Sequence, residues 1–401
     1  MVNRGRVFAY CHDSVGIGHL ARTLAICDKL SGQYPFSSFL VATGTPFIPL
    51  FSDLARVDYI KLPALAKESP EDYRSKYLPI EFNQLLEYRK AVLRNTVEHF
   101  APETVLVDKA PLGVCGELIP ALRWLKAKRP ETRIVFGMRD IEDDASSTIA
   151  QWARLGVPEI LEECFDEIWV YGQRDLFDVA TEYQLSTANQ AKLSFLGYVT
   201  RGSCGHALPV DKDVNQRESV LVTVGGGTDG EFLLDLYLSE AAERVSALGL
   251  KSLVVGGPDL PPTSGRLLRQ RAAQLPHVEW VDFEPCVSCR IRTSRLVVSM
   301  GGYNTMCQIA AAGANALIVP RTKPRMEQAL RAQLWADRGL VHTTDPNHIN
   351  SRTLADAVVM QLLEDKKPNQ CDLDLHGLDR VAERFGAFWK GEATRAASVC
   401  V

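Results

Sequence analysis

The amino-acid sequence predicts an α/β protein built from two Rossmann-like, doubly wound domains that face each other across a cleft. Short apolar runs alternate with longer stretches of helical periodicity along most of the chain, which is typical of parallel sheets with crossover helices. This pattern pauses once, at residues 197–218, where glycine, proline and charged residues replace it. A length of 401 residues agrees with two domains of about 150–200 residues each.

The first half contains five predicted strands, at residues 6–11, 38–43, 104–107, 133–137 and 167–171. Helical spacing of apolar residues marks 20–30 and 81–99. The strands read as near-continuous apolar runs, as expected for a parallel sheet buried on both faces. We therefore predict an N-terminal Rossmann-like domain at residues 1–200.

The second half repeats the alternation, with predicted strands at 220–224, 252–255, 296–299 and 316–320. We predict a linker at 201–217 and a second Rossmann-like domain at 218–370. An amphipathic stretch at 373–390 follows a charged break. We predict that the tail, 371–401, is a helix that packs back on the first domain.

Composition and charge exclude several classes of protein. Lys plus Arg number 45 and Asp plus Glu 49, so no basic field would hold nucleic acid by counterion release. Two N-terminal arginines precede an apolar stretch too short for a signal peptide. Ten unevenly spaced cysteines fit a reducing compartment, where most would be small buried hydrophobic residues. We expect a cytoplasmic protein.

The first predicted strand runs into a glycine turn, CHDSVGIGHLAR at residues 11–22. Gly16 and Gly18 would let the backbone approach a ligand at a helix N-terminus. The third glycine of a dinucleotide-binding turn is replaced by Ala21, and no acidic residue obviously ends the second strand. This departure disfavours NAD.

Three strands of the second half also end in glycine turns, and Gly256 and Gly257 form one of them. The other two turns contain Gly225, Gly226, Gly227 and Thr228 in the first case and Gly301, Gly302, Asn304 and Thr305 in the second. Backbone N–H groups at such turns, supported by helix dipoles, suit a diphosphate. The lysine and hydroxyl of a P-loop are missing from all of these turns, so we expect the diphosphate to be a leaving group.

The segments GGYNTMCQIAAAGANALIVPR (301–321) and EQALRAQ (327–333) resemble the donor-binding region of GT-B glycosyltransferases. The resemblance is closest to the family of the peptidoglycan N-acetylglucosaminyltransferase and its predicted-glycosyltransferase relatives. The GIGHLAR segment is similar to the acceptor-side glycine loop of that family. Both halves are covered in order, over about residues 6–339.

The resemblance implies a nucleotide bound to the second domain, with its phosphates over the glycine turns. Gln308 stands where the family carries a ribose-binding Glu, and a Gln can keep one such bond. Glu327 and Gln328 match the family's pair that binds sugar hydroxyls. Arg321 and Arg325 are placed to neutralise the departing diphosphate without a metal. The alternative for these arginines is a solvated basic loop.

His19 is the candidate base that would deprotonate the acceptor hydroxyl, because histidine titrates near neutrality. Asp108 would either orient the His19 imidazole or serve as a helix N-cap. His19 itself could be a cap that only holds its turn, and His12 is the reserve candidate for the base. Gly16, Gly18 and Arg139 would lie on the acceptor side.

These features together predict a metal-independent, inverting glycosyltransferase that moves a sugar from a UDP-sugar to a hydroxyl acceptor. The nucleotide-sugar would be a substrate, and no cofactor is expected. Two alternatives stay open. One is a nucleotide-sugar hydrolase or epimerase on the same scaffold, and the other is a noncatalytic nucleotide-sugar binding protein, which Gln308 makes conceivable.

Three further patterns in the sequence are weaker indicators of function. The lone C-x-x-C at Cys286 and Cys289 lacks further zinc ligands, so we predict two buried thiols. The acidic stretch 140–144 is predicted to be a solvated loop rather than a metal site. Tyr73, Tyr77, Leu78 and Ile80 could form an apolar acceptor surface, with peripheral membrane contact if the acceptor is lipid-linked. We favour the alternative, the edge of a core helix.

Overall fold

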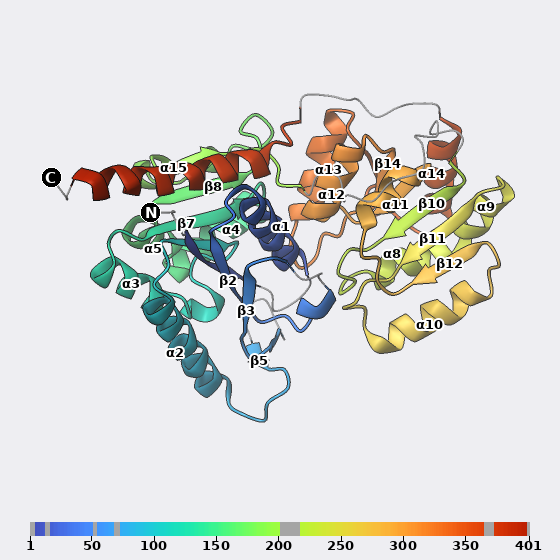
Figure 1. The fold of residues 1–401 in the computed structure, drawn as a ribbon. Helices are drawn as coiled ribbons and strands as arrows, with labels where there is room; N and C mark the ends of the chain where they lie inside the picture. The colour runs from blue at the N-terminus through green and yellow to red at the C-terminus, as the bar shows by residue number, and fades with distance from the viewer. Residues whose placement is uncertain are drawn as a thin grey trace. The chain divides into compact units, whose positions relative to one another are not determined.

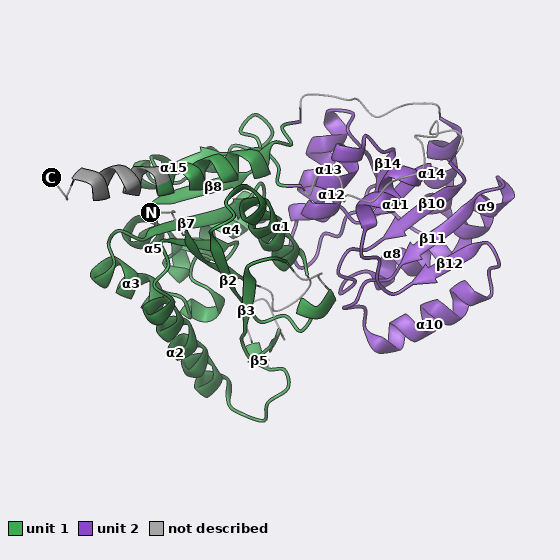
Figure 2. Cartoon of the chain, viewed as in Figure 1, with its two compact units in different colours: residues 1–199, 374–401 green, residues 200–373 purple. Residues whose placement is uncertain are grey.

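A computed structural model describes residues 5–12, 17–50, 54–67, 73–200, 217–364 and 373–398, and side chains up to residue 389. The chain divides into two compact units, shown in Figure 2. Unit 1 comprises Met1–Val199 and Asp374–Val401, and unit 2 comprises Thr200–Leu373. The predicted linker, 201–217, lies outside the described residues except for Arg217.

Unit 1 is built on a seven-stranded, fully parallel sheet with the order β3-β2-β1-β6-β7-β8-β9. The strands are β1 (Arg6–Cys11), β2 (Ser38–Thr43), β3 (Val57–Lys61), β6 (Thr104–Asp108), β7 (Arg133–Arg139), β8 (Glu167–Tyr171) and β9 (Leu193–Phe195). The strand order reverses between β1 and β6, where Cys11 lies opposite Asp108. Such a switch point opens a crevice at the carboxyl ends of the strands, where ligands bind in this class of fold.

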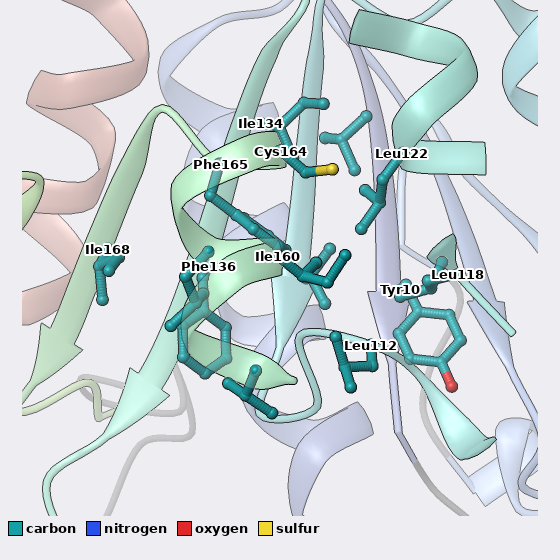
Figure 3. Close-up of a cluster of buried hydrophobic side chains, with 14 of the residues drawn as sticks. Tyr10, Leu112, Leu118, Leu122, Ile134, Phe136, Ile160, Cys164, Phe165 and Ile168 are labelled. Atoms are coloured by element: carbon teal, nitrogen blue, oxygen red, sulfur yellow. The ribbon is translucent and has the colours of Figure 1, made fainter. Parts of the chain in front are cut away.

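Helices cover both faces of this sheet (Figure 1). They are α1 (Gly18–Gln33), α2 (Phe82–Phe100), α3 (Ile119–Lys128), α4 (Ala145–Leu155), α5 (Val157–Cys164), α6 (Val179–Glu182) and α7 (Thr187–Gln190). The described part of residues 1–199 also contains β4 (Leu65–Lys67) paired with β5 (Tyr73–Ser75), and two short 3₁₀ turns, η1 (Ile48–Leu50) and η2 (Val114–Gly116). Figure 3 shows Leu122 of α3 and Ile160 of α5 packing with Phe136 and Tyr10 in the core.

The last helix, α15 (Gly377–Ser398), belongs to unit 1 and packs against α1. The Tyr34 and Trp389 rings meet edge to face at 4.9 Å, and the Tyr34 hydroxyl donates to the Ala382 carbonyl oxygen (2.8 Å). Phe385 lies 5.5 Å from the ring of Trp169 on β8. Aromatic contacts of this kind add to the free energy of area burial. They fix α15 on the body of unit 1.

Unit 2 contains a six-stranded, fully parallel sheet with the order β12-β11-β10-β13-β14-β15. The strands are β10 (Ser219–Thr223), β11 (Lys251–Val255), β12 (Val278–Val281), β13 (Leu296–Ser299), β14 (Ala316–Ile318) and β15 (His342–Thr343). The order reverses between β10 and β13. The prediction of two doubly wound parallel sheets is therefore confirmed, and each sheet has one switch point.

The helices of unit 2 follow the strands in alternation. They are α8 (Glu231–Leu236), a π-helical turn η4 (Tyr237–Ala241), α9 (Ala242–Ala247), α10 (Pro262–Ala273), α11 (Val287–Thr293), α12 (Tyr303–Ala312), α13 (Glu327–Asp337) and α14 (Ser351–Leu363). Their apolar faces join the strands in a second core that includes Val222, Tyr237 and Val298. A capping box starts α14, because Asn350 and Thr353 exchange side-chain and backbone hydrogen bonds.

The segment from Tyr73 to Ile80 differs from our prediction of a core helix edge. Tyr77, Leu78 and Ile80 precede α2 in non-helical backbone and are 65%, 47% and 36% exposed. Tyr73 lies in β5, half-buried, and stacks on Phe82. The spacing of apolar residues resembled a helix, but Pro79 disfavours helical backbone in the residue before it, and α2 begins only at Phe82.

Among the described residues, none of the helices combines the length and apolar character needed to cross a bilayer.

Candidate functional site

The switch point of unit 1 brings two predicted residues together. His19 is the second residue of α1, the helix that follows β1 along the chain, and β6 ends at Asp108. His19 Nδ1 lies 3.2 Å from Asp108 Oδ1. The His19 side chain is 16% exposed and that of Asp108 is fully buried. Asp108 therefore lies against the imidazole instead of capping a helix.

Of the two glycines predicted on the acceptor side, the structure describes one. Gly18 is exposed at the start of α1, while Gly16 lies outside the described residues. His12 directly follows β1 and is half-buried. The solvent-facing part of His19 thus lies at the opening of the switch point, where a ligand hydroxyl could reach it.

Arg22 contacts both His19 and Asp108, and it was not among the predicted site residues. Its guanidinium binds Asp108 at two points, with Nε 3.0 Å from Oδ2 and Nη2 2.5 Å from Oδ1. The same Nη2 lies 3.1 Å from His19 Nδ1. Because residues three apart share a helix face, the spacing from His19 to Arg22 could have indicated the pairing. Arg22 is 3% exposed.

Burial and the three charges set the protonation of the site. Burial is the main cause that lowers the pKa of His19 to about 4; Arg22 and Arg139 act in the same direction, while Asp108 opposes them. Burial alone would raise the pKa of Asp108, but Arg22 and the hydrogen bond from His19 outweigh it and hold that pKa at about 2. At neutral pH the site therefore contains a neutral imidazole beside a carboxylate-guanidinium pair.

The acidic stretch 140–144 is not the solvated loop that we predicted. Asp140, Glu142 and Asp143 are 2%, 4% and 8% exposed, because they continue from the buried end of β7. Glu142 lies 3.5 Å from Lys109 Nζ and 3.7 Å from Arg139 Nη2, so its charge is compensated inside the fold. Lys109 is far from Glu142 along the chain, and a local sequence pattern does not show such a contact.

A buried ion pair anchors the turn that follows Asp108. Arg89 of α2 binds Glu117 through Nε and Nη2 at 2.5 and 2.7 Å. The Tyr10 hydroxyl donates to Glu117 (2.6 Å) and accepts a bond from the Val114 amide (3.3 Å). Gly113, at φ +69°, lies in this turn. The turn between β6 and α3 is therefore tied to β1 and α2, which holds the end of β6 in place.

The switch point of unit 2 consists mainly of backbone. The turn after β10 contains Gly225 and Gly227 at φ +65° and +97°, and the turn after β13 contains Gly301 at φ +82°. These conformations favour glycine. A Cβ on Gly227 would lie 2.6 Å from the Gly256 carbonyl oxygen, whereas a Cβ on Gly225 or Gly302 would meet nothing within 4 Å. Gly225 and Gly302 thus have open space for a ligand.

The first turn of α12 faces this open space. It begins after Gly302, whose lack of a side chain leaves room for an anion to approach the helix N-terminus. Asn304, Thr305 and Gln308 lie in the first two turns of α12 and are half-buried. In the turn after β10, Gly226 is half-buried and Thr228 is exposed.

The predicted donor residues after β14 bind one another. Arg321 lies 3.0 Å from Asp229 in the β10 turn and 2.9 Å from Glu327, which is 3% exposed. With its amide nitrogen facing the Met300 carbonyl oxygen (2.6 Å), Gln328 accepts a bond from Arg321 Nε (3.2 Å). A diphosphate at Arg321 would therefore compete with two carboxylates. Arg325 is half-buried, and its carbonyl oxygen accepts from Arg321 (3.4 Å).

A fully buried arginine supports the second turn and was not predicted. Arg331 of α13 donates through Nη1 to the Gly301 carbonyl oxygen (3.2 Å). Its guanidinium also lies 5.6 Å from the centre of the Tyr303 ring. Arg331 thus fixes the Gly301 carbonyl group, two residues before the start of α12. It occurs in the EQALRAQ segment, where it could be mistaken for a surface charge.

The pair Cys286 and Cys289 is half-buried, so the prediction of two buried thiols is wrong. Cys286 precedes the short helix α11, which exposes part of the pair, and the two Sγ atoms are 2.9 Å apart. Cys11, Cys27, Cys164 and Cys307 are buried as expected, whereas Cys115 is exposed. Within the part of the chain that the structure describes, no three His, Cys, Asp or Glu residues form a group that could hold a metal ion.

Comparison with known proteins finds similarity to the family that the sequence motifs resemble. Residues 220–384 match the glycosyltransferase family 28 C-terminal domain. A relative from Phenylobacterium zucineum, "UDP-N-acetylglucosamine--N-acetylmuramyl-(pentapeptide) pyrophosphoryl-undecaprenol N-acetylglucosamine transferase", is 28% identical over 140 residues, which cover 35% of this chain and 38% of that protein. The transferase of the same name from Mannheimia succiniciproducens is 26% identical over 257 residues, or 62% and 68% of the two chains.

Among solved structures, a "putative UDP-N-acetylglucosamine 2-epimerase from Listeria monocytogenes" superposes with a TM-score of 0.64. It is 12% identical, and the superposition covers 97% of this chain and 96% of that one. At this identity the likeness shows the fold alone. The matches confirm the GT-B fold and the relationship to the peptidoglycan N-acetylglucosaminyltransferase family, although the alignment to the first relative spans little more than a third of its length.

Proposed function

We propose that this GT-B relative of the family 28 glycosyltransferases is itself a glycosyltransferase that moves a sugar from a UDP-sugar to a hydroxyl acceptor. The observation that carries the proposal is the contact between His19 and Asp108 at the switch point of unit 1. The open glycine turns at the switch point of unit 2 support a diphosphate there. Base and diphosphate site are the two elements that the reaction requires.

In the proposed mechanism, His19 acts through Nε2. The acceptor hydroxyl gives its proton to Nε2 while its oxygen forms a bond to the anomeric carbon of the sugar. The bond from that carbon to the diphosphate oxygen breaks, and the electron pair leaves with the diphosphate. A single displacement of this kind inverts the anomeric configuration. Asp108 stabilises the imidazolium that forms, as the acid does in other base-acid pairs.

The donor would be held by unit 2. Amide groups at the start of α12 and in the β10 turn would bind the diphosphate, and the positive end of the α12 dipole would stabilise its growing charge. Gln308 would bind the ribose, and Glu327 with Gln328 the sugar hydroxyls. These groups supply charge stabilisation without a metal, so we propose metal-independent transfer.

The acceptor side would belong to unit 1, with Gly16, Gly18 and Arg139 near the hydroxyl. The exposed residues Tyr77, Leu78 and Ile80 precede α2 in the same unit. If the acceptor is lipid-linked, these side chains would be available for its apolar part or for a membrane surface. A water-soluble acceptor would not need them.

A binding and turnover panel tests the proposal. UDP, GDP, dTDP and their common sugars are first screened by thermal shift, because a ligand that binds the native state raises its stability. The best donor is then incubated with a set of hydroxyl acceptors, with EDTA and without. We expect UDP-sugar binding, and acceptor-dependent release of UDP that EDTA does not abolish.

The same panel separates the alternatives. UDP release without any acceptor would indicate a hydrolase, and a rearranged sugar still attached to UDP would indicate an epimerase. Tight donor binding with no product, unaffected by His19→Ala, would indicate a noncatalytic binding protein. Absence of a shift with every nucleoside diphosphate would overturn the proposal.

A further inference from the structure

Arg22 has no role in the reaction proposed above, yet it contacts both members of the catalytic pair. We propose that Arg22 is a positioning residue: it neutralises Asp108, so that His19 stays uncharged and can accept the proton of the acceptor hydroxyl. The inference rests on the proposed function, because it assigns Arg22 a role through His19. Arg22 itself, at 3% exposure, would not touch the substrate.

The contacts between Arg22 and Asp108 support a positioning role for Arg22. Two guanidinium nitrogens bind the two oxygens of Asp108, at 3.0 and 2.5 Å, in the planar fork that arginine forms with a carboxylate. Thr23 Oγ1 lies 3.4 Å from Oδ2. Asp108 is thus held by Arg22 and Thr23 of α1 in addition to its contact with the His19 ring. Its position no longer depends on the imidazole.

The buried charge of Asp108 also supports this role for Arg22. Asp108 is fully buried, and a buried carboxylate needs a countercharge. Only Arg22 and His19 lie within ion-pair distance of it among the described residues. With Arg22 present, the pair is already neutral. Without Arg22, the buried carboxylate would draw a proton onto the group, and His19 beside it would become the cation; an imidazolium cannot act as a base.

The other charged groups around His19 act in the same sense. Arg139 at the end of β7 disfavours a proton on the imidazole, as does Arg22 itself. Tyr171 of β8 faces Asp108, and its ring lies 5.6 Å from the Arg22 guanidinium. Asp108 favours protonation of His19, against these two arginines. Arg22 is therefore the residue that cancels this effect.

The tautomer of His19 follows from the same contacts. A guanidinium only donates and a carboxylate only accepts. Because Arg22 Nη2 is engaged with Asp108 Oδ1 at 2.5 Å, we assign the imidazole hydrogen to Nδ1, where it is donated to the same oxygen (3.2 Å). The lone pair is then on Nε2, the nitrogen available to a hydroxyl.

Nitrogen NMR of the full chain tests the inference without any substrate. The ¹⁵N shifts of the imidazole nitrogens are followed from pH 4 to 9 in the wild type, Arg22→Gln and Arg22→Lys, with His19→Gln to assign His19 among the eight histidines. We expect a neutral wild-type His19 with its hydrogen on Nδ1. In Arg22→Gln the titration midpoint should rise by about two pH units or more, and in Arg22→Lys by less.

Arg123→Gln is the matched control. Arg123 forms a two-point pair with Glu163 at 2.8 and 2.9 Å, the same arrangement as Arg22 with Asp108, but on the surface of unit 1. Its removal should leave the His19 midpoint unchanged. If Arg22→Gln does not fold, the double variant Arg22→Gln/Asp108→Asn removes both charges, and its His19 should again titrate at low pH.

Activity provides a second readout once an acceptor is known. In Arg22→Gln, kcat/KM at pH 5 should fall about tenfold and recover toward the wild-type value near pH 7 as His19 loses its extra proton. A purely structural role would lower kcat/KM equally at all pH values. An unchanged His19 midpoint in folded Arg22→Gln, or a wild-type hydrogen on Nε2, would overturn the inference even if transfer is observed. The NMR result stands if no transfer is found, so the two proposals fail separately.

Discussion

The two switch points occupy equivalent places in two similar sheets but consist of different groups. In unit 1 the crevice is lined by side chains, with a histidine, an aspartate and an arginine within 3.2 Å of one another. In unit 2 it is lined by glycine backbone at the start of α12, and the charged side chains stand at its rim. In the proposed function, the first site would exchange a proton and the second would bind an anion.

This difference shows how one architecture serves two chemical tasks. A proton acceptor must be a titratable side chain, and its burial requires further charges to compensate it. A diphosphate is bound well by N–H groups that need no compensation, since their dipoles are fixed by the fold. Variants that affect one site and leave the other intact therefore test the comparison directly.

The largest expected effect is on the chemical step, through unit 1. His19→Gln removes the base, and general-base catalysis contributes about 10²–10⁴-fold. We therefore expect kcat to fall by about 10²-fold or more, while the dissociation constant of UDP, measured by calorimetry, stays within about twofold. A comparable loss of UDP affinity would contradict the separation of the two sites.

The next largest effect is on the free energy of unfolding, which should depend on pH because His19 titrates differently in the folded and unfolded chain. The pKa of His19 is lowered to about 4 in the folded protein, against about 6.5 in an unfolded chain. Between these values the unfolded chain binds a proton that the folded protein does not, so the free energy of unfolding decreases as the pH falls from 6.5 to 4. The slope is at most about 1.4 kcal/mol per pH unit for one group.

Urea unfolding at several pH values measures this dependence. His19→Gln should unfold with a shallower pH dependence over this range, because its side chain does not titrate. The contribution of Asp108, whose pKa is held at about 2, should appear only below about pH 4 in both proteins. Parallel curves for the wild type and His19→Gln above pH 4 would contradict the neutral state of His19.

A smaller effect is expected from the backbone of unit 2. Gly302 has φ −61° and open space where a Cβ would be, so Gly302→Ala should fold without strain. The added methyl group would nevertheless hinder a diphosphate that approaches the α12 N-terminus, and we expect UDP binding to weaken about tenfold, or about 1.4 kcal/mol. Calorimetry and a melting curve check the two expectations.

Gly227→Ala is the matched comparison. At φ +97°, and with the Gly256 carbonyl oxygen 2.6 Å from the new Cβ, this variant should lose about 1–3 kcal/mol of stability. If Gly302→Ala binds UDP as the wild type does, the diphosphate does not lie at the start of α12.

The smallest expected effect concerns the rim of the same site. Arg321 is shared between Asp229, which is 46% exposed, and Glu327. Asp229→Asn frees the guanidinium from one carboxylate, so UDP should bind about two- to fivefold more tightly, within the range of exposed ion pairs. Titration calorimetry at two salt concentrations measures it. Weaker binding would indicate that Asp229 itself contacts the donor.

The sequence predicted the fold closely where strands are buried on both faces. Strands β1, β2 and β8 have the predicted bounds, because their apolar runs are unbroken. The edge strands β3 and β9 were missed: β3, VDYIK, has polar residues at both ends of its short apolar segment, and β9 has three residues. An edge strand is exposed on one side, so its sequence carries a weaker pattern.

The site was predicted in part. The glycine turns follow strand ends and His19 lies at the start of the helix after β1, and this local arrangement is visible in the sequence. Arg22, Arg331 and Glu142 were missed or misplaced because charged residues are normally exposed, and each of these is buried through partners distant along the chain. Arg22 and Asp108, for instance, are 86 residues apart.

The position of α15 has a consequence for the order in which the protein folds during synthesis. Unit 2 is a continuous stretch of chain, whereas unit 1 needs both ends of it. When residues 1–199 leave the ribosome, Tyr34 and Trp169 still lack the aromatic rings of α15 that cover them. Domains generally fold as units during translation. Unit 2 can thus complete its core first, and a chain stopped before residue 374 would leave an apolar face of unit 1 open to aggregation.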